Sequence, residues 1–89
     1  MVKGITNSGF EFEVDESVID DIELLEDLRD VKADPTRLVT ICDKLLGTAQ
    51  RKALYEHLRD PETKRVKASQ VDHEVGEIFV QIGTAGKNS

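Results

Sequence analysis

Residues 45–66 constrain the fold most strongly, because they carry the signals that end one helix and that begin and end another. Gly47 follows a leucine-rich segment and is typical of a left-handed helix C-cap. Thr48 is a suitable N-cap for the next helix, and Asp60-Pro61 ends that helix, since the residue before a proline is biased away from helical backbone angles. We therefore expect two helices to meet at Gly47, and a short basic loop to lead from Pro61 into a last helix.

The first fourteen residues predict a β-hairpin. Phe10, Phe12 and Val14 alternate with acidic residues, and this period of two is typical of a half-buried strand. The glycine-containing turn Asn7-Ser8-Gly9 separates that strand from the apolar residues at 2–5. A lone hairpin is marginally stable in water, so its phenylalanine face is expected either to lie on the helices or to pair with the strands of another subunit.

The rest of the chain predicts about four amphipathic helices, at residues 17–31, 35–46, 48–60 and 69–82, because apolar residues recur there every three or four positions. The expected inward-facing side chains are Val18, Ile22, Leu25 and Leu28, with Ile19 and Leu24 widening the stripe, then Leu38, Ile41, Cys42 and Leu45, then Leu54 and Leu58 with Ala53 and Tyr55, and finally Val71, Val75, Ile78, Phe79 and Ile82. Gly83 is expected to end the last helix and to begin a flexible tail over residues 83–89. The predicted fold is mainly α, a small bundle of about four helices with an N-terminal β-hairpin, in a single domain at residues 1–82.

Three apolar residues, Val39, Leu46 and Val80, fall beside these stripes rather than on them. They are either scattered surface side chains, which are common, or part of an apolar surface that contacts a partner.

Composition restricts the partners and the compartment. The net charge of −6 over 89 residues argues against a nucleic-acid partner, because phosphate contacts require a clustered positive surface. The single cysteine cannot form an internal disulfide, and the chain has neither a signal peptide nor an apolar run that could cross a bilayer. We therefore expect a protein of the cytoplasm with no membrane partner.

The sequence predicts no catalytic, cofactor-binding or metal site, and no enzymatic activity. His57 and His73 have no second histidine or cysteine at ligand spacing. Cys42 lies on an apolar stripe, where a free cysteine usually acts as a small buried hydrophobe. Residues 60–71 are similar in length to a calcium loop, but Arg65 replaces the glycine of the sharp turn and Val71 replaces the bidentate glutamate.

The charge is distributed unevenly along the chain. Residues 1–34 hold eleven acidic and three basic side chains, whereas residues 35–89 hold seven acidic and nine basic ones. These groups are either solvated surfaces or the two halves of a head-to-tail contact between copies, which would build a homo-oligomeric ring or filament. The candidate residues for that contact are Asp20, Glu23, Asp27 and Asp30 on the acidic helix, and Arg51, Lys52, Lys64, Arg65 and Lys67 in the basic segments.

The central segment also resembles a known family. A leucine-rich helix ends in Leu46-Gly47, the next reads Gln50-x-x-x-Leu54-Tyr55-Glu56-His57-Leu58-Arg59-Asp60, and a charged turn ends in Val66. This pattern is similar to the small tail assembly chaperones of long-tailed bacteriophages, and the likeness extends to the acidic helix at 20–28 and to residues 75–79. The resemblance implies a protein that binds the tape measure protein in the infected cell and keeps it soluble and extended. It also implies that this chaperone gives way as the major tail protein polymerises.

Such chaperones often occur also as a longer form made by ribosomal frameshifting, and Gly86-Lys87 can be encoded by a slippery GGG AAA run. The acidic helix allows an alternative function, in which the chain is an acidic adaptor or a DNA-mimic inhibitor of a host protein.

Overall fold

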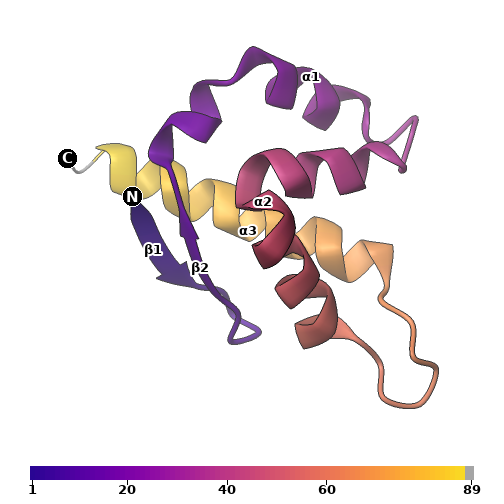
Figure 1. Cartoon of the computed structure of the whole chain (residues 1–89). Coiled ribbons are helices and arrows are strands. Elements are labelled where there is room, and N and C mark those ends of the chain that lie inside the picture. Colours follow the sequence, from indigo (N-terminus) through magenta and orange to yellow (C-terminus); the bar gives the residue numbers. More distant parts are fainter. Residues whose placement is uncertain (88–89) are drawn as a thin grey trace.

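The computed structural model describes residues 1–87 and shows a two-stranded hairpin packed against α-helices (Figure 1). In chain order the elements are β1 (Val2–Ile5), β2 (Glu11–Val14), the 3-10 helix η1 (Glu16–Asp20), α1 (Ile22–Asp30), α2 (Arg37–Leu58) and α3 (Ala68–Lys87). The prediction of a mainly helical fold with an N-terminal hairpin is confirmed.

The described residues form three α-helices rather than the predicted four. The expected second and third helices are the two halves of α2, which changes direction at Gly47 (Figure 1). Gly47 has φ 80° and ψ 161°, a conformation in which a side chain would be strained. The break therefore lies at the predicted residue, and α2 consists of two helical segments that meet at this kink without a connecting loop.

The prediction of one helix over residues 17–31 was wrong at its N-terminal end. Residues 16–20 form η1, and α1 begins only at Ile22. Asp21 separates the two because its backbone is extended and its carboxylate caps α1. The Oδ1 atom of Asp21 accepts hydrogen bonds from the amides of Glu23 at 2.9 Å and Leu24 at 3.4 Å.

The buried face of α1 also differs from the predicted stripe. Leu24 is fully buried, whereas Ile22 is 65% exposed and Leu25 is 41% exposed. The helix is rotated because Asp27 faces α2, where it bonds to Arg37 and Lys44. As a consequence, α1 directs two large apolar side chains outward.

The end of α3 was predicted incorrectly as well. Helical structure continues through Gly83 to Lys87, so most of the expected tail at 83–89 is helical; residues 88 and 89 lie outside the described part of the chain. A glycine costs a helix about 1 kcal/mol relative to alanine, but it keeps its backbone donor and acceptor. It therefore weakens a helix without ending it, unlike a proline.

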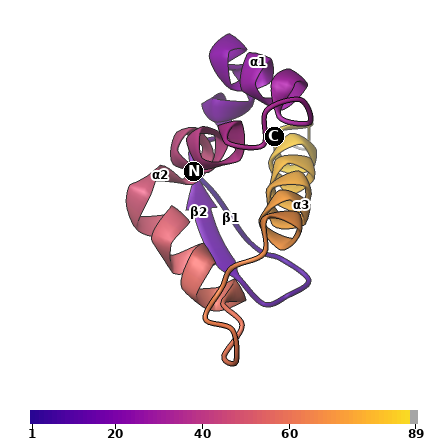
Figure 2. The same ribbon diagram turned by 90° about the vertical axis from the view of Figure 1, so that its right-hand side faces the viewer.

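The hairpin lies between α2 and α3 (Figure 2). β1 and β2 are antiparallel, with Val2 opposite Val14 and Gly4 opposite Phe12. Phe10, Phe12 and Val14 are buried, so the phenylalanine face lies on the helices of the same chain. This is the first of the two arrangements that the sequence left open.

The core joins this face to all three helices, but Ala53, which was expected to face inward, is exposed because the second half of α2 turns the neighbouring Leu54 into the core. The predicted stripe of α3 is confirmed, since Val71, Val75, Ile78 and Ile82 are buried. Cys42 is also buried, as predicted, and burial raises the pKa of its thiol to about 11. The thiol is therefore protonated at neutral pH and is not a reactive nucleophile.

Candidate functional site

The structure separates the four acidic candidates into two free and two paired carboxylates. Asp20 in η1 and Glu23 in α1 are exposed, and neither has a basic group within 4 Å among the described residues. Asp27 and Asp30 bind cations of their own chain. Only the first two are available to a partner.

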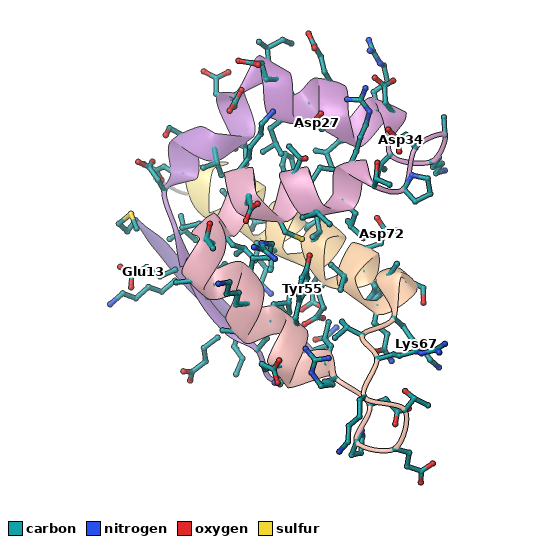
Figure 3. The ribbon with its side chains drawn as sticks, turned by 45° about the vertical axis from the view of Figure 1, so that its right-hand side comes forward. Glu13, Asp27, Asp34, Tyr55, Lys67 and Asp72 are labelled. Atoms are coloured by element: carbon teal, nitrogen blue, oxygen red, sulfur yellow. The ribbon has the colours of Figure 1, made fainter. Side chains whose placement is uncertain are left out.

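Asp27 is buried between α1 and α2, which corrects its expected place on an exposed acidic face (Figure 3). It accepts a hydrogen bond from Lys44 Nζ at 2.7 Å and another from Arg37 Nη1 at 2.9 Å. The bond from Lys44, together with the one from Arg37, lowers the pKa of the Asp27 carboxyl. Asp27 therefore fixes the rotation of α1 instead of serving a partner.

Asp30 is engaged in a different way. Arg29 donates to it through Nε at 2.8 Å and Nη2 at 3.0 Å, and Arg37 lies 3.9 Å away. The hydrogen bonds from Arg29 lower the pKa of the Asp30 carboxyl. This bidentate pair neutralises Asp30 at the surface.

The pH dependence of stability should reveal the role of Asp27. Its folded pKa lies below the unfolded value of about 3.9. The ion pairs therefore stabilise the fold above that pH, and this contribution is lost as the pH falls through the lowered folded pKa. We expect Asp27→Asn to be less stable than the natural chain at pH 7, and the difference to shrink under acid, as measured by urea unfolding over a pH series.

The matched control is Asp20→Asn, because Asp20 is exposed and has no ion-pair partner in residues 1–87. It should unfold like the natural chain at each pH. A deficit of Asp27→Asn that stays constant down to acid pH would show that the carboxylate charge does not hold α1 on α2.

Among the basic candidates, Arg51 is paired within the chain. Its Nε donates to Asp43 Oδ1 at 2.5 Å, and its guanidinium lies 5.3 Å from the centre of the Tyr55 ring. Lys52, the next residue, is exposed and has no acidic group within 4 Å in the described chain. The predicted Arg51-Lys52 cluster thus supplies one free cation.

The remaining basic candidates lie on the connection between α2 and α3, residues 59–67, here called the basic loop. Asp60 shapes it, because Oδ1 accepts hydrogen bonds from the amides of Glu62 at 2.8 Å and Thr63 at 3.2 Å. Arg59 Nη1 donates to the carbonyl oxygen of Lys64 at 2.7 Å. Lys64 itself has a positive φ of 62°.

These bonds leave three basic side chains pointing into solvent. Lys64, Arg65 and Lys67 are exposed, and none of them forms an ion pair within the described residues. The basic loop is thus closed on itself by its backbone and by Arg59 and Asp60, while its free cations remain available.

The free acidic and basic groups lie at opposite ends of the molecule. η1 and α1 are at the top of Figure 1 and the basic loop is at the bottom. The longest dimension of the chain is 42 Å. The exposed carboxylates of Asp20 and Glu23 therefore do not meet the cations of the basic loop within one chain.

Sequence reasoning missed a polar cluster that fastens the hairpin tip to α2 and α3. Glu74 is only 3% exposed, and its Oε1 accepts hydrogen bonds from Ser8 Oγ at 2.6 Å and Thr6 Oγ1 at 2.8 Å. His57 Nε2 lies 3.0 Å from the carbonyl oxygen of Ser8 and 3.1 Å from its hydroxyl. Within the described cluster Glu74 bonds to Ser8 and Thr6 and not to His57, so these residues lack the acid–histidine contact of a catalytic triad. The cluster is suited to holding the turn in place.

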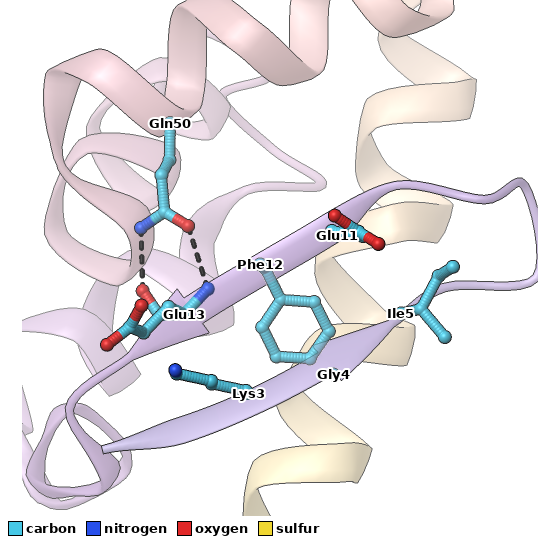
Figure 4. A pocket seen from close by; sticks show the side chains of 7 residues that line it. All are labelled: Lys3, Gly4, Ile5, Glu11, Phe12, Glu13 and Gln50. Atoms are coloured by element: carbon cyan, nitrogen blue, oxygen red, sulfur yellow. Dashed lines mark hydrogen bonds between the residues drawn. The ribbon is translucent and has the colours of Figure 1, made fainter.

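A shallow pocket on the outer face of the hairpin contains no comparable chemistry. It is lined by Lys3, Gly4, Ile5, Glu11, Phe12, Glu13 and Gln50 (Figure 4). The amide of Gln50 bonds to the main chain of Glu13 at 2.8 and 2.7 Å. Gln81 bonds to the Ile5 carbonyl at 2.9 Å, so each outer strand edge is partly closed by a glutamine.

Between residues 1 and 87, no group of three or more His, Cys, Asp or Glu side chains could hold a metal ion. The helices of that range are too short or too polar to span a bilayer. No protein-family model, curated protein or solved structure matches the chain.

Proposed function

We propose that this chain is a tail assembly chaperone of a long-tailed bacteriophage or prophage. It binds the tape measure protein, keeps it soluble during tail morphogenesis in the host cytoplasm, and promotes polymerisation of the major tail protein around it. The motif resemblance supports this function, and the residues that carry it form the kinked helix α2 and the basic loop. The role is non-enzymatic.

The observation that carries the proposal is a set of large apolar side chains that the fold leaves exposed. The exposed large apolar side chains are Met1, Ile5, Ile22, Leu25, Val39 and Val80. Of the three residues that fell beside the helical stripes, Leu46 is buried, but Val39 is 47% exposed and Val80 is 69% exposed. Exposed apolar side chains of this kind fit a partner that presents apolar side chains of its own.

The small size of each apolar contact suits a chaperone that must later be displaced. Burial contributes only about 25 cal/mol for each Å² removed from water, so one copy holds an apolar helix weakly. A long client with many apolar segments can hold many copies, each of them bound weakly. A polymerising tail protein can then remove the copies one at a time.

The test is co-expression with the tape measure protein of the same genome, followed by centrifugation. We expect the tape measure protein to stay in the supernatant with the natural chain, and to sediment when the chain carries both Val39→Asp and Val80→Asp. Thr40→Asp is the matched control, because Thr40 is an exposed polar neighbour of Val39. If the tape measure protein sediments equally with and without the natural chain, the proposed function is wrong.

The alternative function, an acidic adaptor or a DNA-mimic inhibitor, has less support from the structure. Asp27 and Asp30 are neutralised within the chain, so two of the four carboxylates assigned to phosphate mimicry are occupied. Displacement of the chain from a bound host protein by duplex DNA would favour this alternative.

A further inference from the structure

We propose that the outward face of α1 receives the basic loop of a second copy, so that copies associate head to tail. This inference concerns the chain alone. It does not depend on the tape measure protein, and its test uses purified protein only.

The outward face of α1 has no partner within the described chain. It presents Ile22 and Leu25, both exposed, beside the exposed carboxylates of Glu23 and Glu26. The surface is therefore both apolar and acidic. A partner that covers it must shield aliphatic groups and also supply positive charge.

The basic loop meets both requirements. Lysine and arginine side chains have long aliphatic stems that cover apolar surface while their charged ends reach outward. Lys64, Arg65 and Lys67 are exposed and unpaired within residues 1–87. Their stems can lie over Ile22 and Leu25, and their cationic ends can reach the carboxylates of Glu23 and Glu26.

The position of the two surfaces requires the contact to be between copies. The loop and α1 lie at opposite ends of a molecule 42 Å long (Figure 1). A contact between two different surfaces leaves one of each free at the ends, so it continues into a ring or a filament. The hydrogen bonds of Asp60 and Arg59 hold the loop in one conformation before it binds. The loop therefore loses less conformational entropy when it docks.

The experiment is sedimentation velocity of the purified full chain over a concentration series at about 0.05 M and about 0.5 M salt. We expect species larger than a monomer to grow with concentration and to decline at high salt, because exposed charges are screened beyond ~10 Å at 0.1 M. Arg65→Glu with Lys67→Glu, and separately Glu23→Lys with Glu26→Lys, should each weaken association about tenfold or more, because like charges then face each other.

The charge swap makes the test specific. When the two variants are mixed, the acidic loop of the loop variant can bind the basic α1 of the α1 variant. The natural basic loop of the α1 variant can likewise bind the natural acidic α1 of the loop variant, so association should return. Lys3→Glu with Lys32→Glu makes the same change in net charge as the loop variant at two exposed positions outside the candidate contact, and should leave association unchanged. Circular dichroism confirms that each variant is folded.

Two results would overturn the inference. One is a natural chain that remains monomeric at every concentration in low salt. The other is a mixture of the two folded variants that associates no better than either variant alone.

Discussion

Replacing Leu24 by alanine is expected to lower the free energy of unfolding by about 2–5 kcal/mol, the range for deleting a fully buried leucine side chain. Leu24 is completely inaccessible and belongs to the main core cluster, so its loss leaves a cavity between α1 and the rest of the molecule. Urea unfolding followed by circular dichroism measures the change.

Ile22→Ala provides the matched control on the same helix. Ile22 is mostly exposed, so its truncation should change the free energy of unfolding by less than about 0.5 kcal/mol. Both variants are measured at low protein concentration to keep self-association out of the comparison. Equal losses for the two variants would show that α1 buries the stripe predicted from its sequence and not the face seen in the structure.

Gly4→Ala should destabilise the chain by about 1–3 kcal/mol, the usual cost of forcing an extra carbon into a packed site. A Cβ atom on Gly4 would lie 2.5 Å from Gln81 Oε1 and 2.6 Å from Phe12 Cζ. The Phe12 ring therefore packs directly over the glycine on the opposite strand. The added methyl group must displace both the ring and the glutamine that closes the β1 edge.

Gly76→Ala is the opposite case. Gly76 lies within α3, and a Cβ atom there meets nothing within 4 Å. Alanine should stabilise the helix by about 0.5–1 kcal/mol, because glycine loses more backbone freedom on folding. A Gly4→Ala variant that unfolds at the same urea concentration as the natural chain would rule out the close packing of the hairpin on α3.

Local sequence signals predicted the elements well. The period of two at Phe10, Phe12 and Val14 identified the hairpin and its buried face, and the apolar stripe of α3 was read correctly. The break at Gly47 could also be predicted, because a glycine after a leucine-rich helix signals a change of backbone conformation. Each of these signals depends on residues close together in the chain.

The orientation of α1 could not be predicted in this way. It depends on Asp27, whose partners Arg37 and Lys44 lie ten and seventeen residues further along the chain. A prediction from the spacing of apolar residues alone places Ile22 and Leu25 inside, because it ignores the effect of a buried ion pair on the orientation of the helix. The same limitation hid Glu74, whose hydroxyl partners on the hairpin are 66 and 68 residues away.

The charged candidate residues also show what sequence can and cannot predict. Sequence placed the acidic residues on one helix and the basic residues near one loop, but it could not tell paired side chains from free ones. Three of the candidates form ion pairs within the chain, namely Arg51, Asp27 and Asp30. Six others form none within residues 1–87, namely Asp20, Glu23, Lys52, Lys64, Arg65 and Lys67. The structure thus reduces the candidate surface to residues that a partner can reach.

The two proposals describe separate surfaces that can act together. Head-to-tail contacts through α1 and the basic loop would set copies in a row, and Val39 and Val80 would then recur at regular intervals along that row. A long client with a repeated apolar stripe matches such an array. Loss of the charge contact should therefore weaken client binding less than loss of the two valines, because the first removes only the alignment of copies.

Light scattering on a gel-filtration column gives the mass of the complex formed with the tape measure protein, and this mass decides whether the chain coats its client. The account predicts one tape measure molecule carrying many copies of the chain, with fewer copies when Val39 and Val80 are replaced by aspartate. A tape measure protein that elutes alone, or that carries a single copy, would contradict a chaperone that coats its client.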